Sequence, residues 1–397
     1  MSLLTVPPEI RLAIYAFHLH QHKQVRLLQQ PTNAHLHLLQ TCRLIRAEAS
    51  PTYSQYISLR TDHQMFQFAS HAPSSLTVAA KHVDIACDGR LLVDPFSGQI
   101  APVSHSHLAL SRLVGVERLR VFEFFSARPI SEFGRSGRFL PRLLLGTERS
   151  MFGGNDTLPN LVSYELYQNP STQARLFSVL PSHHIQELRL SGNIHLPEEV
   201  SLPALRHLII AGVTGNDLDR KGFEPFADAS LESFTHVRRT NLDFELREPF
   251  LLSMAGLSAA SLTSLVLLGC SRVSTEALTA CLMQMQILEH FSLSFFITTE
   301  LEHDFIAAIP NTVMELKLSI TYAWYSLDHS AEERQLCNTL EVNILERPVP
   351  PRLVYVRLGD RLLAEDSRLD RWQEIARARR CNLSAFDWVE EELARQL

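Results

Sequence analysis

Pairs of apolar residues separated by a single position recur through the middle of the chain. Most pairs have a further apolar residue three positions ahead of them. In such a pair both apolar side chains point to one face of a β-strand, whereas the residue between them points to the opposite face. The pattern therefore predicts a series of short strands with one buried face. Its clearest copies are IQELRLSGN (185–193), LTSLVLLGC (262–270), LEHFSLSFF (288–296) and VMELKLSIT (313–321).

The strand pattern returns at a nearly constant interval. The first residues of seven successive pairs lie 24, 20, 29, 28, 26 and 25 residues apart, and leucine-rich repeats, which this pattern resembles, have periods of about 20–29 residues. One repeat cannot bury its apolar face alone, so neighbouring repeats stack with parallel strands. We therefore expect an α/β fold, with parallel strands on the concave face of a solenoid and helices or loops on its convex face. The seven residues are Tyr164, Leu188, Leu208, Val237, Leu265, Phe291 and Leu316.

One copy, from Cys270 to Leu282, is similar to the cysteine-containing subclass of leucine-rich repeats. Ser274 is predicted to cap the helix of this repeat, because a serine side chain can accept a hydrogen bond from the first helical turn. Free cysteines are among the most buried residues, so Cys270 and Cys281 are interpreted as core packing.

Two gaps in the repeat are longer than its period. The first contains the insertion 126–157, whose glycines and arginines predict a basic loop, and the second contains residues 322–335. Insertions of this kind leave a solenoid from one face, often the binding face. Two interpretations stay open here, a partner-binding insertion and a neutral surface loop.

A helical pattern precedes the repeats. In TVPPEIRLAIYAFHL (5–19) two prolines open the segment, as the first turn of a helix permits, and Ile10, Ile14 and Phe17 form one apolar stripe. Similar spacing predicts a second helix around residues 38–49, and a third is expected within 61–71. Residues 1–70 are therefore predicted to form a small helical module before a degenerate repeat array over residues 71–365.

Helical spacing also returns at the end of the chain. Leu369, Trp372 and Ile375 predict one helix, and a second is expected to begin at Asn382 or Ser384. We interpret residues 366–397 as a C-terminal helical cap, because the last repeat of a solenoid needs a cover for its apolar side.

Composition narrows the classes of partner. The net charge of −6 gives no electrostatic reason to expect binding to nucleic acid or to an anionic membrane, and no apolar run reaches the ~20 residues of a membrane span. Six scattered cysteines without a C-x-x-C pair favour a reducing compartment, the cytoplasm or the nucleus.

No phosphate-loop, dinucleotide-binding, nucleophile-elbow or zinc-protease motif occurs in the sequence. We therefore expect no catalytic residue, no cofactor and no metal site, so the protein is not expected to be an enzyme.

Two segments near the N-terminus resemble the F-box in its fungal form. Residues 3–19 are similar to the L-P-P-E-I-R-x-x-I-Y block, and LLQTCRLIRAE (38–48) is similar to the T-C-R-x-I-R-x-E block. Val6 stands where the family has leucine, and Ile45 where many members have tryptophan. The resemblance implies docking on the Skp-type adaptor of an SCF cullin–RING ubiquitin ligase. The residues it assigns to that contact are Pro7, Pro8, Glu9, Ile10, Ile14, Cys42, Arg43 and Arg46.

An F-box followed by leucine-rich repeats implies a substrate-recognition subunit whose repeats bind a protein substrate. Residues between the two apolar positions of each strand line the concave face and are expected to face solvent, and arginine and aromatic residues are enriched at interface hot spots. Two interpretations stay open for Ile209, Val266 and Leu268: an exposed apolar patch that binds a partner, or residues covered by a loop or by the C-terminal tail. The alternative is a non-enzymatic leucine-rich-repeat interaction scaffold whose N-terminal helices only cap the solenoid. The candidate substrate-binding residues are Arg120, Phe122, Tyr167, Arg189, Ile209, Val266, Leu268, Lys317 and Arg357.

Overall fold

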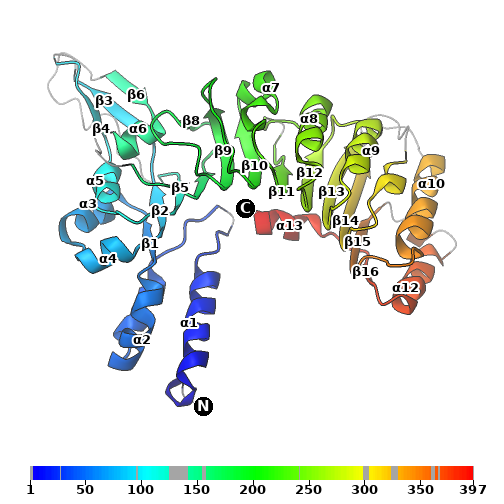
Figure 1. Cartoon of the computed structure of the whole chain (residues 1–397), viewed down its shortest axis with the longest axis horizontal. Coiled ribbons are helices and arrows are strands. Elements are labelled where there is room, and N and C mark those ends of the chain that lie inside the picture. Colours follow the sequence, from blue (N-terminus) through cyan, green and yellow to red (C-terminus); the bar gives the residue numbers. More distant parts are fainter. Residues whose placement is uncertain are drawn as a thin grey trace. The chain divides into compact units, whose positions relative to one another are not determined.

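The computed structural model divides the chain into two compact units, residues Met1–Val200 and Ser201–Gln396 (Figure 1). Each unit mixes helices with parallel strands, which confirms the predicted α/β class. The residues described are 3–26, 28–94, 97–124, 142–153, 158–240, 242–297, 304–322, 330–358, 363–364 and 367–396.

The first unit begins with a helical module and continues as a parallel sheet. The module contains η1 (Leu3–Thr5), α1 (Pro8–His22), η2 (Ala34–Gln40) and α2 (Arg43–Tyr53). The parallel strands follow the order β1 (Tyr56–Leu59), β2 (His82–Ala86), β5 (Arg118–Phe122), β7 (Ser163–Tyr167) and β9 (Glu187–His195), and β8 (Gln173–Arg175) also pairs with β9.

A small antiparallel sheet and four short helices complete this unit. The sheet has the order β4 (Ile100–Pro102), β3 (Arg90–Val93) and β6 (Arg142–Leu145). The helices are α3 (Asp62–His71), α4 (Ser74–Ala79), α5 (Ser106–Ser111) and α6 (Thr147–Phe152).

The second unit contains the regular part of the repeat. Its parallel strands follow the chain order: β10 (His207–Thr214), β11 (Ser233–Val237), β12 (Ser264–Cys270), β13 (His290–Ile297), β14 (Glu315–Tyr322), β15 (Leu353–Arg357) and β16 (Asn382–Ser384). Its helical segments are α7 (Asp217–Lys221), η4 (Glu224–Phe226), α8 (Glu248–Ser258), α9 (Thr275–Gln284), η5 (Phe305–Ala308), α10 (Ser330–Leu340), the π-helical turn η6 (Glu341–Leu345), α12 (Arg368–Ala378) and α13 (Val389–Gln396).

In-register pairing builds one continuous core under the strands of the second unit. Leu265, Phe291 and Leu316 are direct neighbours on β12, β13 and β14, and all three are fully buried. Figure 1 shows α8 and α9 along one side of these strands and α13 on the opposite side. The four strands predicted from the clearest copies of the pattern are confirmed as β9, β12, β13 and β14.

The cysteine-containing repeat folds as its sequence predicts. The Ser274 hydroxyl accepts a hydrogen bond from the Ala277 amide at 3.1 Å, which caps the start of α9. Cys270 and Cys281 are buried, and burial raises the pKa of each thiol to about 12. These two cysteines therefore act as apolar packing residues, as predicted.

The predicted core position on β11 is wrong. Phe234, not Val237, is the neighbour of Leu208 and Leu265, so Val237 faces the opposite side of the sheet. The second core position of β11 is His236, a polar residue that the apolar pattern could not reveal. Its buried ring donates a hydrogen bond from Nε2 to the Phe244 carbonyl at 3.1 Å.

Two further expectations need correction. Asn382–Ser384 forms strand β16 beside β15 instead of opening a helix, because the open edge of β15 supplies backbone partners, and the last helix begins at Val389.

Within the predicted insertion, residues 142–153 form β6 and α6 instead of a loop, whereas 126–141 and 154–157 lie outside the described residues. The Glu148 carboxylate of α6 is buried and accepts backbone hydrogen bonds from Phe177, Val179 and Leu180. In the second gap, residues 323–329 are not described, and α10 begins at Ser330.

Truncating a shared core leucine tests the stacked interior. Leu265→Ala leaves a cavity among well-packed neighbours, so we expect the free energy of unfolding to fall by about 2–5 kcal/mol. Leu257 on α8 is 51% exposed, so Leu257→Ala serves as the matched control and should change stability by less than about 0.5 kcal/mol. Urea denaturation of both variants measures the difference, and equal losses would contradict a common core.

Candidate functional site

Helices α1 and α2 are held together by a partly buried ion pair. Arg11 donates to both carboxylate oxygens of Glu48, at 2.8 Å and 2.5 Å, and the Tyr15 hydroxyl lies 3.4 Å from the same carboxylate. The hydrogen bonds from Arg11 lower the pKa of Glu48. Bidentate pairing fixes the angle between two side chains as well as their distance, so this pair sets which face of α1 is turned towards α2.

The apolar stripe predicted on α1 lies on its exposed surface. The face of α1 that packs inward carries Arg11, Tyr15 and Leu19. In contrast, Ile10 is 53%, Ile14 41% and Phe17 62% exposed. A contiguous exposed apolar surface on a soluble protein marks an interaction site more often than a neutral surface. We call Ile10, Ile14 and Phe17 the α1 stripe.

Most of the residues assigned to adaptor contact lie near the starts of α1 and α2, and Ile14 lies in the middle of α1. Cys42 is half-buried, and its sulfur accepts a hydrogen bond from the Ile45 amide at 3.4 Å, so it caps α2. Arg46 is exposed and donates to the Leu39 carbonyl at 2.9 Å. The remaining assigned residues are all exposed: Pro7, Pro8, Glu9, Ile10, Ile14 and Arg43.

The histidines near α1 bond to neighbouring groups of the chain. His22 hydrogen-bonds the Thr32 carbonyl at 2.6 Å, and His18 pairs with the Tyr53 hydroxyl at 3.1 Å. A hollow of about 420 Å³ lies between α1 and the connection after it, lined by His18, Gln21, His22, Gln24, Arg26, Gln29, Gln30, Pro31 and Thr32. Among the residues that the structure describes, no group of three His, Cys, Asp or Glu side chains is placed to hold a metal ion.

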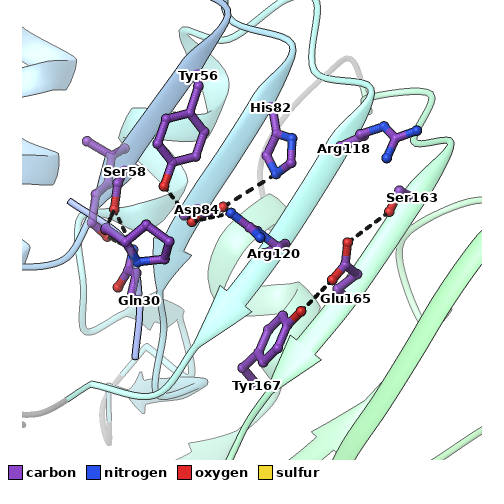
Figure 2. Close-up of polar contacts among 12 residues, drawn as sticks. Gln30, Tyr56, Ser58, His82, Asp84, Arg118, Arg120, Ser163, Glu165 and Tyr167 are labelled. Atoms are coloured by element: carbon purple, nitrogen blue, oxygen red, sulfur yellow. Dashed lines mark hydrogen bonds and ion pairs between the residues drawn. The ribbon is translucent and has the colours of Figure 1, made fainter. Parts of the chain in front are cut away.

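Charged residues of alternating sign form a row across the first sheet (Figure 2). Asp84, Arg120, Glu165 and Arg189 are direct cross-strand neighbours on β2, β5, β7 and β9. Arg120 donates to both oxygens of Asp84, at 2.7 Å and 2.8 Å, and the Tyr56 hydroxyl donates to Asp84 at 2.7 Å. Asp84 is fully buried, and burial raises its pKa while Arg120 opposes the shift.

The four candidate substrate-binding residues of the first unit lie together. The rings of Phe122 and Tyr167 are stacked with centroids 4.8 Å apart, and the Arg189 guanidinium lies 4.5 Å from the Tyr167 ring centroid. Tyr167 also donates to Glu165 at 2.7 Å. The expectation that these residues face solvent is wrong: Arg120, Phe122, Tyr167 and Arg189 are all buried, because they pack on one another and on their ionic partners.

The connection between α1 and η2 reaches the first strand of this sheet. The Gln30 side chain is buried and donates to the Ser58 hydroxyl at 3.2 Å and to the Leu59 carbonyl at 3.3 Å. Asn33 also donates to the Ser58 carbonyl, at 2.7 Å. Burial and the nearby Arg120 and Arg118 charges lower the pKa of Lys23. Ser58 is the direct neighbour of Asp84 on the adjacent strand. The row of charged residues is therefore part of the packing between the first sheet and the N-terminal segment.

The candidate residues of the second unit contact the C-terminal segment of the chain. Val266 and Leu268 pack with Trp388 in one buried cluster, and the half-buried Ile209 packs against that cluster. Lys317 pairs with Glu392 at 2.6 Å, and the exposed Arg357 pairs with Asp387. For Ile209, Val266 and Leu268, cover by the C-terminal tail is confirmed, because they pack against Trp388. The expectation of solvent exposure is wrong for Lys317, which is buried beside Glu392.

Sequence reasoning missed the partners of these candidate residues. Asp84, Glu165 and Glu392 were not singled out, and neither was Trp388. Asp84 and Glu165 carried a usable signal, since each occupies the same between-position as Arg120 on an adjacent strand. Glu392 and Trp388 carried none, because nothing in the repeat pattern places the end of the chain over β12–β14.

Breaking the Arg120–Asp84 pair tests its structural role. Arg120→Met leaves a buried carboxylate without its cation, so we expect the free energy of unfolding to fall by about 3–5 kcal/mol, and the double variant Arg120→Met/Asp84→Leu to lose less. The exposed pair of Arg206 with Glu232 is the control, and Arg206→Met should cost no more than about 1 kcal/mol. Denaturant unfolding of all three variants measures this, and a double variant that loses as much stability as Arg120→Met, or more, would contradict the pairing.

A pH titration tests the packing of η2 on α2. His35 is buried, and burial, with the nearby His22, lowers its pKa to about 4. The folded chain therefore binds this proton less readily than the unfolded chain, so stability is full above pH 6.5 and falls as the pH drops from 6.5 to 4, by about 3 kcal/mol at most. In denaturation at pH 7 and pH 5, His35→Gln should flatten this pH dependence. The exposed His37 is the control, and an equal effect of His37→Gln would contradict the assignment.

No helix in the described part of the chain is long and apolar enough to cross a membrane. No protein-family model matches the sequence, and no curated protein matches it.

Proposed function

We propose that the chain is the substrate-recognition subunit of an SCF-type cullin–RING ubiquitin ligase. The N-terminal module docks on a Skp-type adaptor, and the parallel strands, as a degenerate leucine-rich-repeat solenoid, carry the face that binds a protein substrate. Such a subunit performs no catalysis itself; it raises the effective concentration of the substrate near a partner enzyme. Cytoplasm or nucleus is the proposed location, in keeping with six cysteines that form no disulfide with one another.

The α1 stripe is the observation that carries the adaptor half of the proposal. Its residues belong to the segment that resembles the F-box, and they are exposed although they are apolar. The Arg11–Glu48 pair holds the other face of α1 against α2, so the stripe is presented on a fixed helix. Displaying rigid apolar side chains lowers the ordering cost of binding, which suits a helix used for docking.

The in-register strands support the second part of the proposal, the binding of a protein substrate. They bring Arg120, Phe122, Tyr167 and Arg189 together in the first unit, and Val266, Leu268 and Lys317 onto one face in the second. Aromatic and arginine side chains, as in the first unit, and an apolar patch, as in the second, are each more typical of protein interfaces than of small-molecule sites.

A scaffold whose N-terminal helices only cap the repeats remains a second candidate. The bonds from Gln30 and Asn33 to Ser58 on β1 favour it, since they make the N-terminal segment part of the packing of the first sheet. A docking module must bind an adaptor through the α1 stripe, whereas a cap needs no such partner. Adaptor binding therefore separates the two candidates.

A charge placed in the α1 stripe tests the adaptor contact. We expect the wild-type chain to co-purify with a Skp-type adaptor and Ile14→Asp to weaken that binding at least about tenfold, because an apolar contact is replaced by a desolvated carboxylate. Val114 is 80% exposed and lies outside the module, so Val114→Asp is the matched control.

Circular dichroism of both variants checks that the fold is retained. A wild-type chain without adaptor affinity, or equal binding by Ile14→Asp and Val114→Asp, would reject the adaptor half and leave the scaffold.

A further inference from the structure

The last residues of the chain lie on the face of the second unit that the repeat pattern assigns to ligand binding. This C-terminal segment consists of Phe386, Asp387, Trp388 and helix α13. It sits on the side of the strands opposite to α8 and α9 (Figure 1). The segment therefore occupies a surface that no repeat needs for its own core.

The apolar part of the contact is centred on Trp388. Its side chain is 2% exposed and packs in one cluster with Ala211, Val237, Val266 and Leu268. These four residues come from β10, β11 and β12, and register places three of them, Ala211, Val237 and Leu268, in one row. The indole Nε1–H donates to the Leu318 carbonyl at 3.1 Å. An indole anchor with its one donor satisfied is typical of an interface hot spot.

The polar part of the contact is centred on the buried Lys317, whose charge is paired with two carboxylates. Lys317 is 5% exposed, and its ammonium lies 2.6 Å from Glu392 and 2.9 Å from Glu315. The same ammonium lies 5.7 Å from the centroid of the Tyr355 ring. Burial alone lowers the pKa of Lys317, but the hydrogen bonds that its ammonium donates to both carboxylates outweigh burial and raise the pKa. A charge in this position is costly without an ionic partner.

Trp388 and Glu392 present both parts of the contact from one side of a helical turn. They are four positions apart, the spacing at which side chains of a helix lie one above the other. Val389 and Leu393, also four apart, are half-buried against the same apolar cluster. The face thus selects a helix that carries an aromatic residue followed four positions later by a carboxylate.

Helix α13 and the residues just before it are held weakly enough for a ligand to displace them. Helix α13 has eight residues, and isolated helices shorter than about 12 residues are marginal in water, so its order depends on the face beneath it. Its remaining anchors are weak, because Phe386 is 43% exposed on the Tyr355 ring and the Arg357–Asp387 pair is exposed on both sides. The segment follows directly after β16, so it binds with the high effective concentration of an intramolecular ligand.

We propose that this face is a binding site for an amphipathic helix of a protein ligand with an aromatic residue and a carboxylate four positions apart, and that α13 occupies it in cis until the ligand displaces it. The inference rests on the ligand-binding half of the proposed function and is independent of adaptor docking at the α1 stripe.

A labelled peptide with the sequence of residues 385–397 is the probe. We expect it to bind the full-length variant Trp388→Ala/Glu392→Gln at least about tenfold more tightly than the wild-type chain, because the tethered segment no longer competes. Glu392→Gln alone, which keeps the side-chain shape, should give an intermediate gain. Glu390 is exposed on the same helix, so Glu390→Gln is the matched control and should bind the peptide as weakly as the wild type. Fluorescence anisotropy measures all four proteins.

Changes in the peptide itself locate the contact without altering the fold of the protein. Peptides with Trp388→Ala or Glu392→Gln should bind the double variant at least about tenfold more weakly, and a peptide with Glu390→Gln should bind unchanged. Failure of the double variant or of Glu392→Gln, each with native circular dichroism, to bind the peptide more tightly than the wild type would overturn the proposal. Equal binding of all three altered peptides would also overturn it. Ile14→Asp in the protein should not change peptide affinity, which keeps this outcome separate from adaptor docking.

Discussion

Because neighbouring strands of the large sheet pair in parallel and in register, equivalent positions of these strands line up in rows. On one side the rows are apolar and form a shared core, as with Leu265, Phe291 and Leu316. On the other side the same register lines up the residues that stand between the apolar positions of each strand. Charged residues, or apolar ones, therefore lie next to one another along a row. Both the stability of each unit and the chemistry of its open face follow from this pairing.

A segment of the same chain contacts the sheet in each unit. In the first unit Gln30 and Asn33 bond to the strand edge beside the Asp84–Arg120 pair. In the second unit Trp388 and Glu392 satisfy an apolar cluster and a buried lysine. The two contacts differ in kind, since the first consists of hydrogen bonds to the strand β1, whereas the second depends on a helix of eight residues. The second face is therefore the one that a ligand can open at lower cost.

Much of the fold could be predicted from the sequence, because the strand pattern is local. The apolar pairs located β9, β12, β13 and β14, and Ser274 marked the start of α9. The prediction failed where distant contacts override local preference. His236 occupies a core position because the Phe244 carbonyl accepts its hydrogen bond, and Asn382–Ser384 becomes a strand because β15 offers a free edge. The candidate residues do come together on the sheet faces, but those of the second unit are covered by Trp388 and Glu392, which lie far from them in the chain.

The core of the second unit should stay folded when the segment on its open face opens. Native-state hydrogen exchange tests this most directly. Amides of β12, β13 and β14 should exchange only through global unfolding, whereas those of Val389–Gln396 should exchange through local opening of much lower free energy. Protection of α13 equal to that of the strands would show that the helix is part of the core, and it would contradict a face that is open to a ligand.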